Sequence, residues 1–218
     1  ARTACAMERE LFHIGYNAIL CNTGGSIENN KAYLQMLVNQ GVCGIICIGS
    51  VFKNTLQETL MLSEFSHIPF VLSHCQIPAD NTYSVVINEK HGIRLCVEHL
   101  LEKGHQDILY VKDADTYSGE RKKSAFRENM VRLDLPINDK TIFNTYRSFE
   151  GGIAVVKEIL ASGSKFSAII FGDDITAAGG LFALKKAGYR VPEDVAIVGY
   201  NNSPASICCD PQLTTVDN

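Results

Sequence analysis

The sequence contains no tryptophan and no hydrophobic stretch long enough to cross a bilayer. Its longest apolar runs, at residues 43–48 and 195–198, are far shorter than the roughly 20 residues that a transmembrane helix requires. No charged start followed by an apolar core, the pattern of an export signal, is visible at the N-terminus. We therefore expect a cytoplasmic protein with no membrane partner.

An excess of positive charge is also absent. The chain has 20 lysines and arginines against 24 aspartates and glutamates, which gives a net charge of −4 at pH 7. Because a domain that binds nucleic acid through its own surface usually carries a basic patch, this stretch is not expected to contact DNA itself. With 46% hydrophobic and 20% charged residues it has an ordinary globular composition, and its 218 residues suffice for one large or two small domains.

Signatures of catalysis and of cofactor binding are missing as well. No G-x-G-x-x-G follows a predicted strand, and neither a G-x-x-x-x-G-K-[ST] loop nor a G-x-S-x-G elbow occurs. Asp173 and Asp174 are adjacent and can bind Mg²⁺ or act as paired carboxylates. However, adjacent side chains at a helix start diverge, and capping already explains aspartate there. We expect no cofactor and no enzymatic activity.

The histidines and cysteines do not converge on a metal site or on a disulfide framework. Cys96 and His99 are one helical turn apart, but His105 lies beyond Gly104, so no metal is expected. The eight cysteines lack a regular spacing, and a disulfide between adjacent residues such as 208 and 209 would be strained. Free, buried thiols in a reducing compartment are the expectation.

Short apolar runs alternate with segments of helical periodicity along the whole chain. Strands are predicted at 16–21, 43–48, 70–72, 85–87, 108–111, 168–171, 195–198 and 214–216. Helices are predicted at 27–39, 55–65, 89–103, 119–133, 149–161 and 174–187. This alternation, with nearly continuous apolar strands, predicts an α/β fold whose parallel sheets are covered by helices on both faces.

The polar segment at 75–84 is the candidate domain boundary, which gives an N-terminal subdomain at 1–75 and a C-terminal subdomain at 76–216. We predict two doubly wound parallel-sheet subdomains with a ligand cleft between them. Ligands in such folds lie beyond the carboxyl ends of the strands. Polar residues follow those ends in both halves, although ordinary strand-end loops are polar too. These residues include Ser50, His74, Asp113, Asp173 and Asn201, and Tyr117 lies a little beyond Asp113.

The strand at 195–198 ends in the sequence G-Y-N-N. A glycine and a tyrosine let the chain leave the sheet, and two adjacent amides follow, Asn201 and Asn202. Two interpretations are open. Either Asn201 faces the cleft as a ligand contact while Asn202 serves the turn, or both amides satisfy the backbone of the loop.

Three stretches together resemble one protein family. They are H-G-I-R-L-C-V-E-H-L-L-E-K-G-H-Q-D-I-L-Y-V at 91–111, the segment from F-G-D-D-I-T to V-G-Y-N-N at 171–202, and P-Q-L-T-T-V at 211–216. These motifs are similar to the effector-binding region of lactose-repressor/galactose-repressor transcription regulators. The resemblance implies a type I periplasmic-binding-protein fold, a small-molecule effector bound between two subdomains, and a homodimer. It also implies operator DNA as a partner, bound through a helix-turn-helix head that this sequence does not contain.

The resemblance also transfers ligand-binding positions to this chain. They fall on Asp173, where the family usually has Asn, on Asn201, where it has an acid, and on His74, where it again has an acid. The family's arginine falls on Lys122, and the adjacent Arg121 is the alternative. All four positions depart from the family's commonest residue: Asn offers one acceptor and one donor group where Asp offers only acceptors, and Lys lacks the planar fork of Arg. The resemblance implies a sugar or another small polar molecule as effector, and these departures leave open two alternatives to a standard sugar site, a different polar ligand or a pocket that no longer binds one.

Ser50 and Tyr117 complete the candidate ligand-binding set, since both follow predicted strands. The resemblance further implies that a strand precedes residue 1 and that chain continues beyond residue 218. The alternative function is that of a soluble sugar-binding protein of a transporter, which shares the fold. A helix-turn-helix segment at the natural N-terminus would select the regulator, and a cleavable signal peptide there would select the transporter protein.

Overall fold

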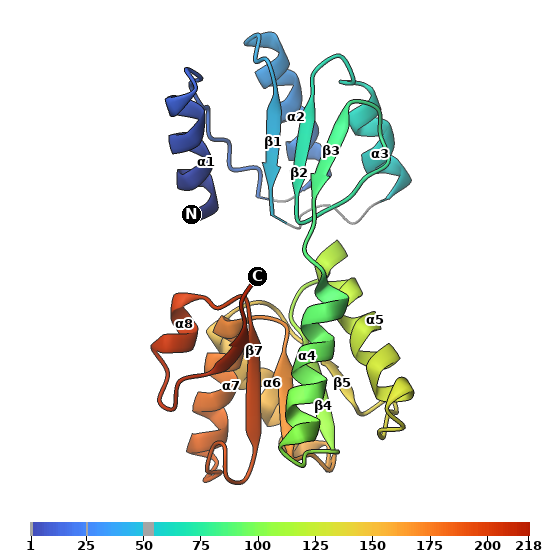
Figure 1. Cartoon of the computed structure of the whole chain (residues 1–218), viewed down its shortest axis with the longest axis vertical. Coiled ribbons are helices and arrows are strands. Elements are labelled where there is room, and N and C mark those ends of the chain that lie inside the picture. The colour runs from blue at the N-terminus through green and yellow to red at the C-terminus, as the bar shows by residue number, and fades with distance from the viewer. Residues whose placement is uncertain (1, 25, 50–54) are drawn as a thin grey trace. The chain divides into compact units, whose positions relative to one another are not determined.

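The computed structural model describes residues 2–24, 26–49 and 55–218. The chain divides into two compact units, Ala1–Ile87 and Asn88–Asn218, and each contains one sheet whose strands are all parallel (Figure 1). The α/β class and the two parallel sheets confirm the fold predicted from the sequence.

The first unit contains a three-stranded sheet in the order β1-β2-β3. Its elements are α1 (Arg2–His13), α2 (Ile27–Asn39), β1 (Ile45–Ile48), α3 (Leu56–Ser63), β2 (Phe70–Ser73) and β3 (Thr82–Val85). Two of its helices are capped by side chains, since Ser26 accepts a hydrogen bond from the Asn29 amide and Thr55 forms a capping box with Glu58.

The prediction of a strand at 16–21 was wrong. Residues 16–20 are irregular, and the apolar side chains of Ile19 and Leu20 are exposed. A strand exists only through hydrogen bonds to a neighbouring strand, and within the described ranges no strand pairs with this segment. Its apolar composition alone does not make it part of a sheet.

The boundary between the units lies later than the polar segment suggested. Thr82–Val85, which overlaps residues taken as a polar turn, forms β3 and pairs in parallel with β2, with Phe70 opposite Thr82. Because pairing with β2 joins this polar strand to the first sheet, the first unit extends to Ile87 and not to residue 75.

The second unit contains a five-stranded sheet in the order β5-β4-β6-β7-β8. Its helices are α4 (Glu89–Glu102), α5 (Tyr117–Arg132), α6 (Phe149–Ala161), α7 (Asp174–Lys186) and α8 (Pro204–Ile207). Its strands are β4 (Ile108–Lys112), β5 (Ile142–Asn144), β6 (Ala168–Phe171), β7 (Ala196–Tyr200) and β8 (Thr214–Val216). β5 and α8 were not predicted, because three or four residues are too few to show a period.

Helices cover both faces of this second sheet, as predicted. On one face Ile93 and Val97 of α4 and Phe126 of α5 pack against Tyr110 and Ile170 of the strands. On the other face the buried side chains of α6 and α7 pack against alternate residues of the same strands. The strand residues on this face are Leu109, Val111, Ile169 and Phe171, and the helix residues are Val155, Val156, Ile159, Leu181 and Leu184. The sheet is thereby rigidly held, and its strand ends provide fixed positions for polar groups.

The start of α6 gives a first testable prediction. Ser148 caps this helix, since its hydroxyl oxygen accepts a hydrogen bond from the Gly151 amide at 3.0 Å. Replacing Ser148 with Ala is expected to lower the free energy of unfolding by about 1 kcal/mol, because the amide loses its acceptor. Urea denaturation measures the loss. Ser148→Asp should retain most of the stability, and equal losses in both variants would contradict the capping role.

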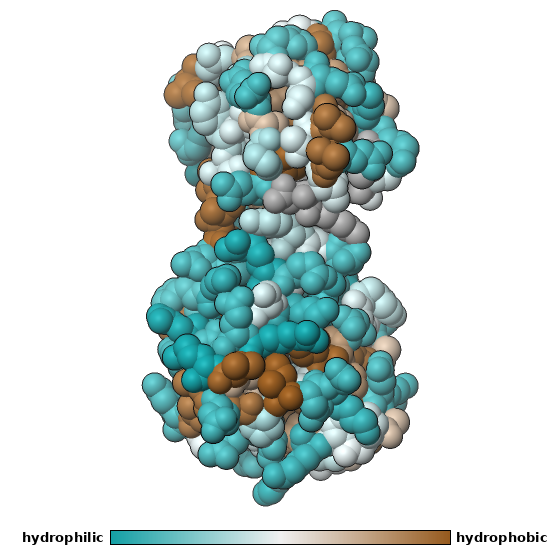
Figure 2. All heavy atoms as spheres, turned by 90° about the vertical axis from the view of Figure 1, so that its right-hand side faces the viewer, coloured by the Kyte–Doolittle hydropathy of each residue, from teal (hydrophilic) through white to brown (hydrophobic). Residues whose placement is uncertain are grey.

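The molecular surface shows no broad apolar region in the view of Figure 2, where hydrophilic residues cover most of each unit and hydrophobic ones gather in small patches. None of the helices in the described ranges combines the length and hydrophobicity that crossing a bilayer demands.

All eight cysteines, each a described residue, are free thiols, and of these only Cys75 and Cys96 are buried. The expectation that the cysteines are generally buried was therefore wrong.

Candidate functional site

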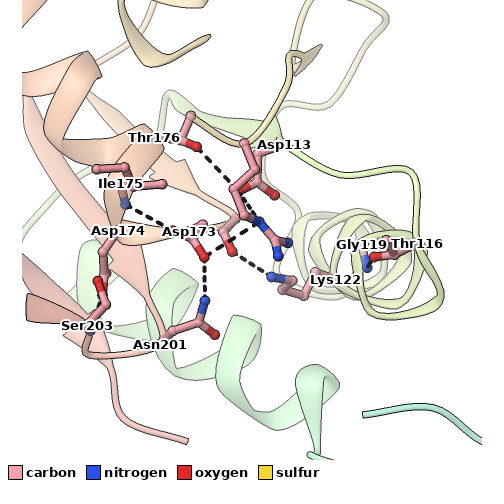
Figure 3. Close-up of polar contacts among 12 residues, drawn as sticks. Asp113, Thr116, Gly119, Lys122, Asp173, Asp174, Ile175, Thr176, Asn201 and Ser203 are labelled. Atoms are coloured by element: carbon pink, nitrogen blue, oxygen red, sulfur yellow. Dashed lines mark hydrogen bonds and ion pairs between the residues drawn. The ribbon is translucent and has the colours of Figure 1, made fainter. Parts of the chain in front are cut away.

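A cluster of polar side chains lies where three neighbouring strands of the second unit end. Asp113 follows β4, Asp173 follows β6 and Asn201 follows β7, and these strands are adjacent in the sheet. Figure 3 shows Asp113, Asp173 and Asn201 directed toward one another, with Lys122 of α5 beside them. Since all the strands are parallel, their carboxyl ends meet at one edge of the sheet, the usual place for a ligand in α/β folds.

Asp173 links the helix α7 to the loop after β7. Its Oδ1 atom accepts a hydrogen bond from the Ile175 amide at 3.0 Å and caps α7, and its Oδ2 atom accepts one from Asn201 Nδ2 at 2.6 Å. Burial raises the pKa of Asp173, although the Ile175 amide and the Arg147 guanidinium act in the opposite direction. The carboxylate is therefore held in place by two fixed donors.

Asp174 points elsewhere, as expected for adjacent residues at a helix start. It is fully buried, and its two carboxylate oxygens accept hydrogen bonds from the Ser203 amide and the Thr215 hydroxyl, each at 2.6 Å. The two aspartates thus do not form a carboxylate pair. Asp173 belongs to the polar cluster, and Asp174 joins α7 to the segments around β8.

Arg147 connects the two carboxylates of the cluster. Its Nε atom donates a hydrogen bond to Asp113 Oδ2 at 3.3 Å and lies 3.6 Å from Asp173 Oδ2. Burial acts to lower the pKa of Arg147, but the charges of Asp113 and Asp173 outweigh it and raise that pKa. The Arg147 side chain remains 39% exposed, whereas the Asp113 side chain is buried.

Three buried oxygens in this unit are left without a partner. Among the described residues, Tyr110 Oη, Tyr200 Oη and Asp113 Oδ1 are the buried side-chain atoms that make no hydrogen bond. An unsatisfied buried polar atom costs roughly 1–3 kcal/mol, so such atoms are uncommon away from functional sites. Gly172 lies directly against Asp113, because a Cβ atom there would be 2.7 Å from Asp113 Oδ1.

The two adjacent amides in the loop after β7 make different contacts. Asn201 and Asn202 both have positive φ, 96° and 44°, a conformation that Asn adopts more readily than most residues. The Asn202 amide donates to the hydroxyl of Thr215 at 3.2 Å and so holds the loop. The side chain of Asn201 donates to Asp173 and accepts from Asn218 at 3.0 Å. Asn201 therefore belongs to the cluster, and Asn202 belongs to the turn.

The other residues predicted from the sequence lie in three different places. Lys122 is buried beside the cluster. Arg121 donates to Glu89 Oε2 at 2.9 Å and to the Tyr117 hydroxyl at 3.3 Å, so Arg121 and Tyr117 form a separate group. His74 lies in the first unit with φ of 68°, and Ser50 lies outside the described residues. The roles of these residues as ligand contacts stay predictions from the resemblance and from their positions.

Two members of the cluster, Asp113 and Arg147, were not in the candidate ligand-binding set predicted from the sequence, although Asp113 was noted at a strand end. Asp113 follows a predicted strand, so its position was a usable signal. Arg147 follows β5, a strand too short to be recognised, and precedes the cap Ser148. No group of three or more His, Cys, Asp or Glu side chains in the described part of the chain is arranged to hold a metal ion.

Comparison with known proteins agrees with this geometry. Residues 97–218 match the model of the periplasmic binding protein-like domain. A regulator of Lachnoclostridium phytofermentans named "HTH-type transcriptional regulator" is 28% identical over 97% of this chain and 64% of its own length. The "HTH-type transcriptional repressor PurR" of Salmonella arizonae is 31% identical over 97% of this chain and 62% of its own length.

A solved structure shares the fold. The LacI family transcriptional regulator of Lactobacillus casei, determined with bound glucose, superposes with a TM-score of 0.83 at 24% identity, over 98% of this chain and 80% of that one. The chain therefore belongs to the periplasmic-binding-protein-like domain family. Over nearly its whole length it is also similar to two curated proteins that are named HTH-type transcriptional regulators or repressors. It spans less than two thirds of the length of both curated regulators.

Proposed function

We propose that this chain is the effector-sensing region of a DNA-binding transcription regulator. We further propose that the cluster of Asp113, Arg147, Asp173 and Asn201 binds the polar part of a small molecule. The observation that carries the proposal is the position of this cluster at the carboxyl ends of three adjacent parallel strands. The names of the curated relatives, which are regulators and not enzymes, support sensing over catalysis and over transport.

The charges of the cluster indicate the chemistry of the ligand. The carboxylates of Asp113 and Asp173 are balanced by Arg147 within the cluster and by Lys122 beside it, so the cluster and Lys122 together have no net charge to attract an ion. Carboxylates accept hydrogen bonds, a guanidinium donates them, and the Asn201 amide does both. Hydroxyl groups are donors and acceptors at once, and a neutral polyhydroxyl molecule matches this set. The glucose bound to the relative from L. casei is one example.

Ligand binding becomes a signal only if the ligand favours one of two conformations of the regulator. The change in DNA affinity is then limited by the difference between the ligand's affinities for the two conformations, and the coupling is reciprocal. We propose that operator DNA is bound by a helix-turn-helix head outside this sequence and that the regulator acts as a homodimer. The names and greater lengths of the curated relatives support the first of these statements.

Thermal-shift screening tests the proposed function. Purified protein is heated with members of a panel of sugars, nucleosides and small acids, and the melting temperature is recorded. A ligand present at 100 times its dissociation constant is expected to add about 2.7 kcal/mol to the free energy of unfolding. The absence of stabilisation by every compound, or conversion of a bound compound to product, would contradict the proposal.

The role of Asn201 gives a sharper prediction. Asn201→Ala is expected to weaken binding of the ligand found in the screen by about 1–3 kcal/mol, or roughly 5- to 150-fold, because a buried hydrogen bond is lost. Isothermal titration calorimetry measures the affinity. Asn202→Ala is the matched control, since Asn202 also has positive φ, which disfavours Ala at both positions. If both variants bind as tightly as the parent protein, Asn201 is not a ligand contact.

A further inference from the structure

The side chain of Lys122 is buried in a way that is unusual for lysine. The residue is 2% exposed, whereas lysine is rarely buried unless its charge is compensated. Its ammonium nitrogen donates a hydrogen bond to the Gly172 carbonyl at 2.5 Å and lies 4.5 Å from the centroid of the Tyr200 ring. These contacts fix the lysine between the end of β6 and the end of β7.

The two residues that Lys122 contacts are the chain neighbours of two cluster residues. Gly172 directly precedes Asp173, and Tyr200 directly precedes Asn201. Asp173 and Asn201 are themselves joined by the 2.6 Å hydrogen bond across the ends of the strands. One ammonium group therefore holds both strand ends at the points from which the cluster extends.

Charged and titratable groups surround this ammonium from every element packed on it. Asp113 after β4, Asp173 before α7 and Glu89 of α4 favour its charge, and Arg147 opposes it. Cys96 of α4 and the two tyrosines, Tyr110 and Tyr200, lie in the same buried region. Burial lowers the pKa of Lys122, and the three carboxylates act in the opposite direction without cancelling that effect.

We propose that Lys122 positions the site without contacting the ligand, by joining α5 to the strand ends that carry Asp173 and Asn201. The ligand-binding part of this inference rests on the proposed function. The resemblance instead assigned Lys122 a direct contact with the effector. The geometry favours positioning, because the ammonium is directed to a backbone carbonyl and a ring face, whereas the side chain of the neighbouring cation, Arg147, is partly exposed.

Hydrogen exchange measured by NMR on the ligand-free protein tests the positioning. The Ile175 amide donates a hydrogen bond to Asp173 Oδ1, and the Asn201 amide donates one to the Val216 carbonyl. In Lys122→Met, the exchange rate of both amides is expected to rise about tenfold or more. Amides at the centre of the sheet, at Ile169 and Ile197, report global stability and should change less. Equal acceleration at all four amides, or at none, would overturn the proposal.

Lys123→Met is the matched control, because it removes the neighbouring lysine from the same helix and is expected to leave the Ile175 and Asn201 amides unchanged. Acceleration equal to that of Lys122→Met would overturn the proposal. Lys122→Gln keeps a neutral hydrogen-bond donor, so exchange of the Ile175 and Asn201 amides is expected to be slower than in Lys122→Met. If Lys122→Met does not fold, Lys122→Gln is used in its place. Exchange in Lys122→Gln identical to that of the parent protein at all four amides would show that the ammonium is not required.

The pH dependence of stability provides a second readout. Since the pKa of Lys122 is lower in the folded state than the ordinary value near 10.4, the unfolded state binds more protons between those two values. The stability of the parent protein is therefore expected to rise with pH through this window relative to Lys122→Met. Parallel pH profiles for the two proteins would show a solvated amine and contradict the placement on which the proposal rests.

Glucose binding separates this inference from the proposed function. If glucose stabilises the parent protein, its affinity is expected to fall in Lys122→Met and to persist in Lys123→Met. Unchanged affinity in Lys122→Met would overturn the positioning role while leaving the proposed function intact. If neither glucose nor any other panel compound binds the parent protein, the proposed function fails, and the hydrogen-exchange result still decides whether Lys122 holds the two strand ends.

Discussion

Replacing Gly179 with Val is expected to lower the stability of the second unit by about 3 kcal/mol or more. Gly179 lies in α7 against the start of α6, and a Cβ atom there would lie 1.9 Å from the backbone oxygen of Phe149. A second close approach occurs at Gly152 of α6, where a Cβ atom would lie 2.0 Å from the carbonyl oxygen of Thr176 in α7. Because both obstacles are backbone atoms, the helices must move apart to admit any side chain.

Urea denaturation followed by circular dichroism measures the loss in Gly179→Val. Val has a helix propensity similar to or better than that of Gly, so propensity alone does not predict a loss. Ala154→Val places the same side chain on an exposed position of α6 and should cost less than about 1 kcal/mol. Equal denaturation midpoints for the two variants would show that α6 and α7 can separate without cost.

The close approach of these two helices has a consequence for the candidate site. Helix α7 begins directly after Asp173, and Arg147 directly precedes Ser148, the residue that caps α6. The distance between α6 and α7 therefore contributes to the 3.6 Å separation of the Arg147 guanidinium and the Asp173 carboxylate. Glycines outside the cluster thus help to set its geometry.

Helices of this chain were predictable because their signals are local. Ser148 and Ser26 are caps that lie next to the apolar stripes that they precede, and both helices begin where predicted. Strands were less predictable, because a strand depends on a partner that is distant in the sequence. The polar residues Thr82–Val85 became β3 by pairing with β2, whereas the apolar residues at 16–20 remained irregular.

The same difference explains which parts of the site were found. Asp173 and Asn201 could be selected from the sequence because both lie at the ends of recognisable strands and within the motifs that resemble the regulator family. The pairing of Arg147 with Asp113 joins residues from separate elements, and no local pattern reports it. The burial of Lys122 could not be predicted either, because no local pattern shows that its ammonium contacts the Gly172 carbonyl and the Tyr200 ring.

The adjacent aspartates provide the second prediction with a large effect. Asp174→Ala is expected to lower the free energy of unfolding by about 3 kcal/mol or more, because the Ser203 amide and the Thr215 hydroxyl both lose their buried acceptor. Gly199 shows how closely the carboxylate is packed, since a Cβ atom there would lie 2.3 Å from Asp174 Oδ1. Chemical denaturation measures the loss.

Asp173→Ala is the matched comparison, and its expected pattern is the reverse. It removes a helix cap worth about 1 kcal/mol and also relieves the burial of a carboxylate, so stability should change little. Affinity for the ligand found by thermal shift should instead fall by about 1–3 kcal/mol, because Asp173 and its partner Asn201 lose their mutual hydrogen bond. Asp174→Ala, assayed where it remains folded, should bind nearly as well as the parent protein. If both variants lose stability and affinity together, the assignment of one aspartate to the ligand and the other to the fold is wrong.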